Sequence, residues 1–240
     1  MNTPKKQRRI LTYPNPYLRE VARPVTEFND ELRSLFEDMR VLMHHSDGVG
    51  LAATQVGEPV QLLVLSDYVF LPEAQREKII EEDGDMGEDI AVINPQVIEE
   101  SEVLVVGNEG CLSFPDVYIK VKRPTWVKIS AQDLNGEQIE LRGEGLGARA
   151  ILHEMDHLTG KVMTDHLSFL ARQKALKDHQ KIQRLRADEL TEETGEVEES
   201  PSKTGSTPSK TGSSHSQKRG TVKGKSSAKK GNKTKRKKRK

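Results

Sequence analysis

The segment GLGARAILHEMDHLTG, residues 145–160, carries the strongest structural signal in the chain. It is apolar enough to be buried, and Gly160 is a typical helix stop, so we predict a helix over these residues. His153 and His157 lie four residues apart, and a helix points both imidazoles to one side. The pattern H-E-x-x-H places Glu154 beside the water of a metal bound there. Short patterns also recur by chance in surface helices, but the apolar neighbours argue for burial, where unpaired His and Glu are costly.

A catalytic metal site needs a third protein ligand and one open position. Downstream of the histidine pair, Asp165 and His166 are predicted in a turn, and Asp178 and His179 on a basic, exposed stretch. Cys111, the only cysteine, lies between strand-like segments in NEGCLSFPD, next to a glycine that permits close backbone approach. A soft thiolate is the better partner for two imidazoles, so we favour Cys111 as the third ligand.

The stretch DGVGLAATQVG, residues 47–57, combines glycines and small apolar residues with one amide, Gln55. Such an amide can donate a hydrogen bond to an oxyanion that forms during attack on a carbonyl. The alternative is that Gln55 only hydrogen-bonds the backbone of a packed loop. The segment by itself leaves both interpretations open.

The sequence before residue 145 predicts one further helix, followed by several strands. Apolar residues recur at helical spacing over residues 30–45, after a cap at Asn29 or Asp30. The strands precede the helix at 145–160 rather than alternating with helices, which predicts an α+β fold with antiparallel or mixed sheets around that helix. The predicted strands are VQLLVLS (60–66), IAVINPQVI (90–98), VLVV (103–106) and a hairpin around Asn135-Gly136 in TWVKISAQDLNGEQIELRG (125–143).

Charge and composition divide the chain near residue 190. A further helix is predicted over residues 169–187, and the charged stretch 73–89 is predicted to be a surface insertion. The 240 residues have a formal net charge of +1, but residues 201–240 hold 15 Lys/Arg and no Asp/Glu, which leaves −14 for residues 1–200. We predict one domain, residues 1–190, and a disordered tail, residues 191–240, first acidic and then strongly basic.

The composition also excludes several classes of protein. A single cysteine excludes a disulfide-stapled secreted scaffold. No apolar run approaches the ~18 residues of a membrane span, and the basic start is not followed by the apolar region of a signal peptide. We therefore expect a cytoplasmic protein with no membrane partner.

Three motifs in one order resemble the peptide deformylases: GVGLAATQ at 48–55, EGCLS at 109–113 and HEMDHLTG at 153–160. The resemblance extends over about residues 8–187, including ILTYPNPYLRE and DHLSFL, and leaves the tail uncovered. It implies an α+β metalloenzyme that removes the formyl group from N-formylmethionyl peptides. The implied cofactor is one divalent metal, usually Fe²⁺, with Zn²⁺, Ni²⁺ or Co²⁺ as substitutes.

The resemblance also implies roles for individual residues. Glu154 is the expected acid–base group, and Gln55 and the backbone N–H of Leu112 the expected oxyanion donors. One departure concerns Leu152, because the family commonly has Gln before the first histidine. The expected metal ligands are Cys111, His153 and His157; the expected substrate pocket lies near Val49, Gly50, Leu146, Ala150 and His153; and Arg123 is expected to pair with Asp156 behind the ligands.

Two other functions remain open from the residues alone. One is an H-E-x-x-H endopeptidase, which would need an open cleft and a downstream ligand. The other is a catalytically weak scaffold whose basic tail binds nucleic acid by counterion release. For a deformylase, the tail and the basic helix 169–187 are expected to add attraction to the ribosome and its RNA.

Overall fold

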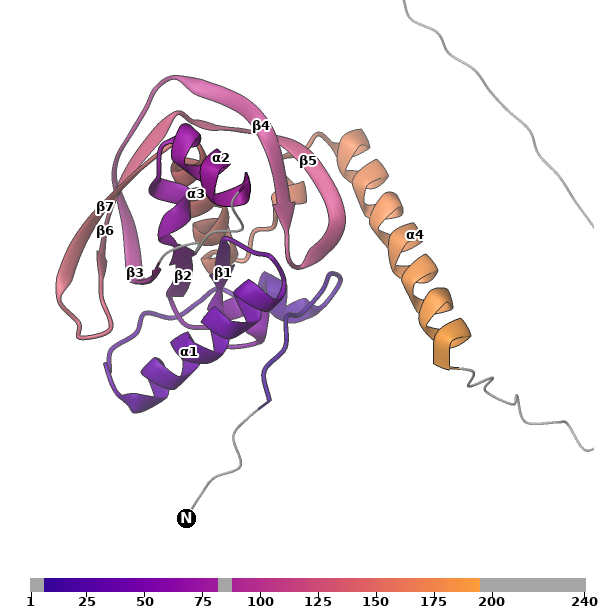
Figure 1. Cartoon of the computed structure of the whole chain (residues 1–240), viewed down its shortest axis with the longest axis horizontal. Coiled ribbons are helices and arrows are strands. Elements are labelled where there is room, and N and C mark those ends of the chain that lie inside the picture. Colours follow the sequence, from indigo (N-terminus) through magenta and orange to yellow (C-terminus); the bar gives the residue numbers. More distant parts are fainter. Residues whose placement is uncertain (1–6, 82–87, 195–240) are drawn as a thin grey trace, which may run out of the picture. The chain divides into compact units, whose positions relative to one another are not determined.

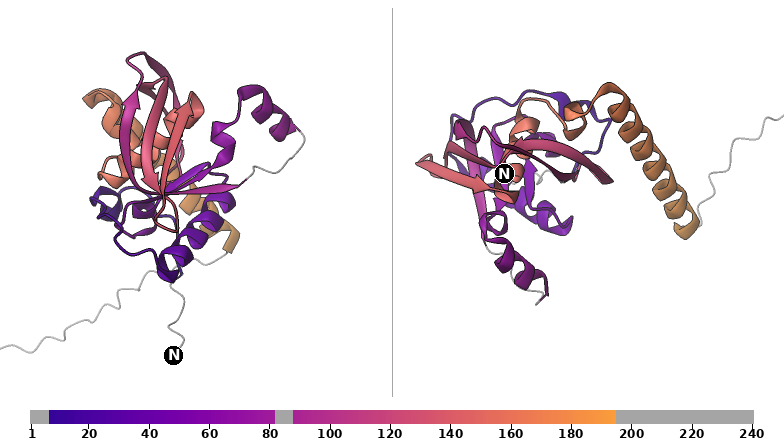
Figure 2. Two further views of the ribbon diagram at one scale, coloured as in Figure 1. Left: turned by 90° about the vertical axis from the view of Figure 1, so that its left-hand side faces the viewer. Right: turned by 90° about the horizontal axis from the view of Figure 1, so that it is seen from above.

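Two antiparallel sheets enclose the central helix of the fold (Figures 1 and 2). The computed structural model describes residues 7–81 and 88–194. All strand pairs within the two sheets are antiparallel, which confirms the predicted α+β class. The first sheet has the order β1-β2-β3-β6-β7, with β1 Gly50–Ala52, β2 Leu62–Ser66, β3 Asp89–Glu100, β6 Trp126–Gln132 and β7 Gln138–Glu144; the second pairs β4 Leu104–Cys111 with β5 Phe114–Pro124.

The helices begin and end close to the positions that their capping residues predict. The side chain of Asn29 accepts a hydrogen bond from the Leu32 N–H at 3.1 Å and caps the first helix. The last helix continues to Thr194 instead of ending near residue 187, so its final residues lie in the predicted tail. The α-helices are α1 Asp30–His45, α2 Glu73–Glu81, α3 Leu146–Leu158 and α4 Phe169–Thr194, and short 3₁₀ turns cover Pro16–Arg19, Ala53–Val56, Asp67–Phe70 and Met163–His166.

The core lies on both faces of the five-stranded sheet. Alternate residues of β2 point to opposite faces, and all of them are buried. Leu63 and Leu65 pack with residues of α3, whereas Leu62 and Val64 pack with residues of α1. A strand covered on both faces needs apolar residues throughout, which explains the uninterrupted sequence LLVL.

The second sheet packs against α4 through its own apolar cluster. Val117, Ile119 and Val121 of β5 are buried, and the residues between them are exposed. The sequence analysis missed β5, although this alternation is the usual signal of a half-buried strand. It also missed β1, whose three residues are too few to show a pattern.

An N-terminal strap, residues 11–22, joins the three motif segments. The Leu11 N–H donates to the Gln55 carbonyl at 2.7 Å, and the Tyr13 N–H to the Ser113 carbonyl at 2.9 Å. The Ala22 N–H donates to the Leu158 carbonyl at 2.9 Å. Each acceptor belongs to a different motif, so the strap helps to hold the three together.

Two sequence predictions concern the periphery. The segment 73–89 was predicted to be a surface insertion. Helix α2 lies in it, between β2 and β3 in the sequence, and the first residues of α2 are exposed as expected. Residues 82–87 lie outside the described part. The predicted disordered, acidic and basic tail lies outside the described residues from position 195 onward. Of the helices that the structure describes, none is long and apolar enough to cross a membrane.

Candidate active site

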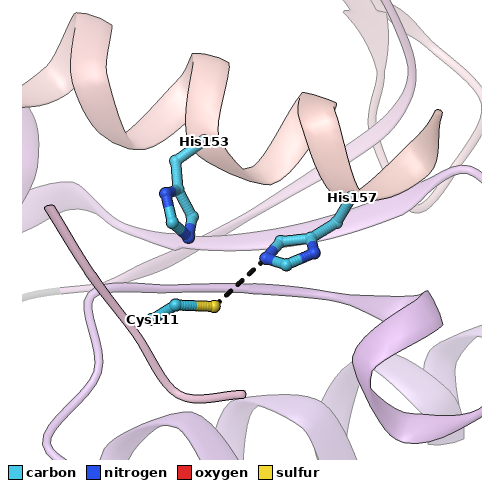
Figure 3. Close-up of side chains that lie close together, drawn as sticks. All are labelled: Cys111, His153 and His157. Carbon is cyan, nitrogen blue, oxygen red and sulfur yellow. Dashed lines mark hydrogen bonds between the residues drawn. The ribbon is translucent and has the colours of Figure 1, made fainter. Parts of the chain in front are cut away.

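Cys111, His153 and His157 converge where the second sheet meets α3 (Figure 3). Cys111 ends β4, and the two histidines lie one turn apart on α3 and face it. The Cys111 Sγ lies 3.3 Å from the His157 Nε2, and one ligand atom of each residue lies within 4.8 Å of the others. The helix spacing and the strand end thus bring together the three residues that the sequence predicts as ligands.

The donor atoms at this site fit a divalent metal ion. Bonds of about 2.0–2.3 Å in a tetrahedron separate the ligand atoms by roughly 3.3–3.8 Å, close to the distance between Sγ and Nε2. One thiolate and two imidazoles leave a fourth position open. The Oε2 of Glu154 and the Nδ1 of His157 are buried, and neither has a hydrogen-bond partner among the described residues. A buried carboxylate oxygen without a partner is what a site built around a reactive water would contain.

The other candidate ligands are engaged elsewhere. Asp165 pairs with Arg19, and His166 lies 2.6 Å from the Asp156 carboxylate. His179 was expected on an exposed stretch, but it is buried, and its Nε2 lies 3.0 Å from the Tyr13 carbonyl oxygen. It is buried because α4 turns this face onto Phe114 of β5.

Glu109 supports His153 from behind. Its Oε2 lies 3.0 Å from the His153 Nδ1, so the Nε2 of that ring is left to face Cys111. Arg123 donates to both carboxylate oxygens, at 2.9 and 3.0 Å, and to the Asp156 Oδ2 at 2.7 Å. Arg149 adds a bond of 2.8 Å to Oε1. Burial alone would raise the pKa of Glu109, but the bonds from His153 and Arg123 outweigh it and lower the pKa to about 2.

The sequence analysis expected Arg123 beside Asp156 but assigned no role to Glu109 or Arg149. The only signal for Arg149 was its charge in a helix predicted to be buried, which calls for a partner but does not identify Glu109 as that partner. Leu152, which stands where the family commonly has Gln, packs against the core under the first sheet. His153 is hydrogen-bonded through Glu109, so that bond does not depend on residue 152.

Glu154 lies against the backbone of Gly50. A Cβ added at Gly50 would lie 2.7 Å from the Glu154 Oε1, so only glycine leaves room for the carboxylate in this position. Burial raises the pKa of Glu154 to about 7, against the opposing effect of the charge on His153. A carboxyl group with a pKa near neutrality can both accept and release a proton.

Both ends of the Gln55 amide are hydrogen-bonded. Its Oε1 accepts a hydrogen bond from the Ala52 N–H at 2.8 Å, so it does bond the backbone of its own turn. Its Nε2 donates to the Ser113 Oγ at 3.1 Å and lies 3.6 Å from the Cys111 Sγ. The amide is therefore held with its N–H groups directed at the segment that carries Cys111 and Ser113.

A pocket of about 560 Å³ opens beside these residues. Val49, Gly50 and Leu112 line it together with His153 and Glu154. The wall also includes residues 114–118 and Arg186 of α4, none of which the sequence analysis had assigned to the site.

Two of the predicted pocket residues lie elsewhere. Ala150 is 7% exposed and belongs to the core between α3 and the first sheet, and Leu146 packs against that core. Neither is among the residues that line this pocket, and both pack in the core between α3 and the first sheet. Of the residues expected at the substrate pocket, Val49, Gly50 and His153 line this pocket and Leu146 and Ala150 do not. Which of them contact the substrate stays a prediction.

Comparison with known proteins identifies the family. The model of the family described as Polypeptide deformylase matches residues 7–173. The chain belongs to the peptide deformylase family. The peptide deformylase of Novosphingobium aromaticivorans is 41% identical over 184 residues, which cover 74% of this chain and 97% of that protein. That of Acinetobacter baumannii is 42% identical over 180 residues, covering 75% and 94%.

Solved peptide deformylases share the fold of this enzyme. The structure from Legionella pneumophila is 36% identical with a TM-score of 0.64, and covers 75% of this chain and 97% of its own. The structure from Ehrlichia chaffeensis is 32% identical with a TM-score of 0.65, covering 75% and 98%. The predicted family, fold class and activity are confirmed: the enzyme removes the N-formyl group from nascent peptides, and the endopeptidase alternative is wrong.

Proposed function

We propose that Cys111, His153 and His157 hold one divalent metal ion and that Glu154 is the acid–base group of deformylation. The observation that carries this proposal is the convergence of the three ligand atoms beside a buried carboxylate whose Oε2 has no partner among the described residues. When bound, the metal supplies a Lewis acid that polarises the formyl oxygen and lowers the pKa of the attacking water.

The side chains around the metal divide the remaining chemistry. Glu154 accepts a proton from the water that attacks the formyl carbon, and delivers it to the α-amino nitrogen as the C–N bond breaks; formate and a free amino terminus are the products. A pKa near neutrality suits both transfers. The Gln55 amide and the backbone N–H of Leu112 stabilise the negative charge on the formyl oxygen during attack.

Val49, Gly50 and Leu112 line the pocket and contact the methionyl peptide there. The formyl carbon carries only a hydrogen, so a narrow approach past Gly50 admits it and excludes larger acyl groups. This restriction supports N-formylmethionyl peptides as substrates over acetylated ones.

The role of each site residue is tested by metal content and turnover measured together. Alanine at Cys111, His153 or His157 should abolish stoichiometric metal. Glu154→Ala should keep the metal and lower kcat by about 10²–10⁴-fold on a formyl-Met peptide. Glu140→Ala, an exposed carboxylate of β7, is the control and should change neither. Retained metal in Cys111→Ala, or near-normal turnover in Glu154→Ala, would contradict the assignment.

We further propose Fe²⁺ as the native metal, with Zn²⁺, Ni²⁺ or Co²⁺ able to replace it. Imidazole and thiolate donors suit all of these ions. Iron-loaded enzyme should lose activity in dilute peroxide, because Fe²⁺ oxidises and the Cys111 thiolate can proceed from sulfenic to sulfonic acid. Nickel- or zinc-loaded enzyme should survive longer. Metal analysis after anaerobic purification decides the native ion, and equal peroxide sensitivity of all forms would argue against iron.

We also propose that the enzyme works in the cytoplasm beside the ribosome, with the polybasic tail adding attraction to ribosomal RNA. Helix α4 supports this with a series of exposed basic residues, and residues 201–240 carry 15 more. Such attraction is independent of sequence and weakens with salt. Truncation after Ser200 should leave the rate on a short formyl peptide unchanged and reduce co-sedimentation with ribosomes at low salt. Equal co-sedimentation of both proteins across a salt series would refute the tail's role. The basic residues of α4 are Arg172, Lys174, Lys177, Lys181, Arg184 and Arg186.

A further inference from the structure

We propose that Arg149 is a positioning residue of the metal centre: it fixes the carboxylate of Glu109, which in turn fixes the ring of His153. The inference rests on the proposed role of His153 as a ligand. Arg149 hydrogen-bonds none of the three proposed ligands, and it does not line the pocket. Its effect on the reaction would therefore be transmitted through Glu109.

The hydrogen bonds at Glu109 show what Arg149 adds. Arg123 alone grips the carboxylate with two parallel bonds, Nε to Oε1 at 2.9 Å and Nη2 to Oε2 at 3.0 Å. Arg149 Nη1 donates a third bond, 2.8 Å long, to Oε1. Oε1 thus accepts hydrogen bonds from both arginines, whereas Oε2 contacts Arg123 and the His153 Nδ1. Without Arg149, the carboxylate could pivot in the fork of Arg123 and carry its bond to His153 with it.

Arg149 is itself held by the two strands of the second sheet. Its Nη1 donates to the Val121 carbonyl of β5 at 3.0 Å, and its Nη2 lies 3.4 Å from the Val105 carbonyl of β4. Its side chain is only 12% exposed. Arg149 precedes His153 by one helical turn, so both lie on the same face of α3. One guanidinium therefore connects the helix that carries two ligands with the sheet that carries Cys111.

Gly107 of β4 provides independent support. A Cβ added there would lie 2.6 Å from the Arg149 Nη2 and 2.8 Å from its Cζ. The glycine is not required by its backbone, because Gly107 is not among the residues with positive φ. The guanidinium in its present position leaves no room for a side chain at residue 107, so a larger residue there would have to displace it. Gly107 and Arg149 are a matched pair, and a change at either should disturb the same carboxylate.

The first test replaces Arg149 in the full-length enzyme. Arg149→Met should weaken Zn²⁺ affinity by about 10–100-fold in competition with a chelator, as loss of groups behind a ligand usually does. It should also change the visible absorption of the Co²⁺-substituted protein, and lower kcat more than it raises KM. Arg149→Lys should recover part of each effect, because one ammonium can still donate to Oε1. Arg76→Met is the control, because Arg76 donates to the Leu71 carbonyl far from this site in the sequence.

The second test moves the guanidinium without removing its charge. Gly107→Ala should displace the flexible end of Arg149 and reproduce the cobalt spectrum and affinity loss of Arg149→Met. In the Arg149→Met background the alanine should have little further effect, since its target is gone. If Arg149→Met fails to fold, Gly107→Ala by itself tests whether Arg149 positions Glu109.

The two proposals fail in different ways. If wild-type enzyme binds no metal, or if His153→Ala keeps it, the proposed site is wrong. If wild type behaves as expected but Arg149→Met, or Gly107→Ala in its place, keeps wild-type zinc affinity and cobalt absorption, the positioning role of Arg149 is wrong. Additive effects of the two substitutions would likewise refute the pairing.

Discussion

Replacing Glu109 by Gln should lower the free energy of unfolding of the metal-free protein by about 3–5 kcal/mol. The carboxylate side chain is 2% exposed and receives donors from Arg123, Arg149 and His153. Glutamine keeps the shape of the side chain but replaces one acceptor oxygen with a donor NH₂ group. That group would face donors, and two arginines would remain beside a site without its negative charge.

Two estimates of the magnitude agree. Removing one partner of a buried ion pair typically costs 3–5 kcal/mol, because the remaining charge stays buried and uncompensated. Independently, a pKa lowered from 4.5 to about 2 corresponds to roughly 3 kcal/mol at neutral pH. This stabilisation is present above the unfolded pKa of Glu109 and is lost as the pH falls through its folded pKa.

Urea unfolding of apo wild type and Glu109→Gln at pH 7 measures the difference directly. Glu140→Gln, an exposed carboxylate of β7, serves as control and should change stability by less than about 1 kcal/mol. If Glu109→Gln unfolds within about 1 kcal/mol of wild type, the carboxylate is not the buried anchor that its contacts indicate.

Three further substitutions test other parts of the structure. Gly50→Ala should push the Glu154 carboxylate aside and lower kcat by about 10–100-fold while metal content stays unchanged, measured by turnover and metal analysis. Leu152→Gln should destabilise the enzyme by about 1–2 kcal/mol in urea but leave Zn²⁺ affinity within about twofold, because the bond to His153 comes from elsewhere. Burial would raise the pKa of Asp165, but its hydrogen bonds and nearby arginines lower it. Asp165→Asn should therefore have a lower free energy of unfolding than wild type at pH 6. This difference in urea unfolding should shrink below pH 3.8, where the carboxylate of the wild type becomes protonated.

Local patterns were sufficient for much of the fold. The Asn29 cap, the helical spacing after it and the Asn135-Gly136 turn depend on neighbours in the sequence, and each was predicted correctly. The end of α4 was not, because residues after 187 lack the apolar spacing that marks a buried helix face. Tyr118 and the lysines that follow it interrupt the apolar residues of β5, and the resulting alternation was overlooked.

In the site, residues within motifs could be predicted, but contacts between distant segments could not. The proposed ligands lie in motifs, so Cys111 and the histidine pair could be recognised from order and spacing. The bonds of Glu109 to Arg149 and His153 could not be recognised in this way, because they join residues 40 and 44 positions apart in the chain. Spacing alone likewise does not tell which residues beside the histidines line the pocket and which, like Ala150, pack in the core.

The N-terminal strap has a consequence for the order in which the enzyme folds during its own synthesis. Ala22 leaves the ribosome early, but its hydrogen-bond partner Leu158 is synthesised 136 residues later. The partner of Tyr13, His179, is synthesised 166 residues after Tyr13. Contacts of such separation form late, because the loop that they close is costly in entropy. Until then the apolar residues of the N-terminal strap lack their native packing contacts. The strap therefore reaches its final position only after all of α3, and α4 as far as His179, have emerged from the ribosome.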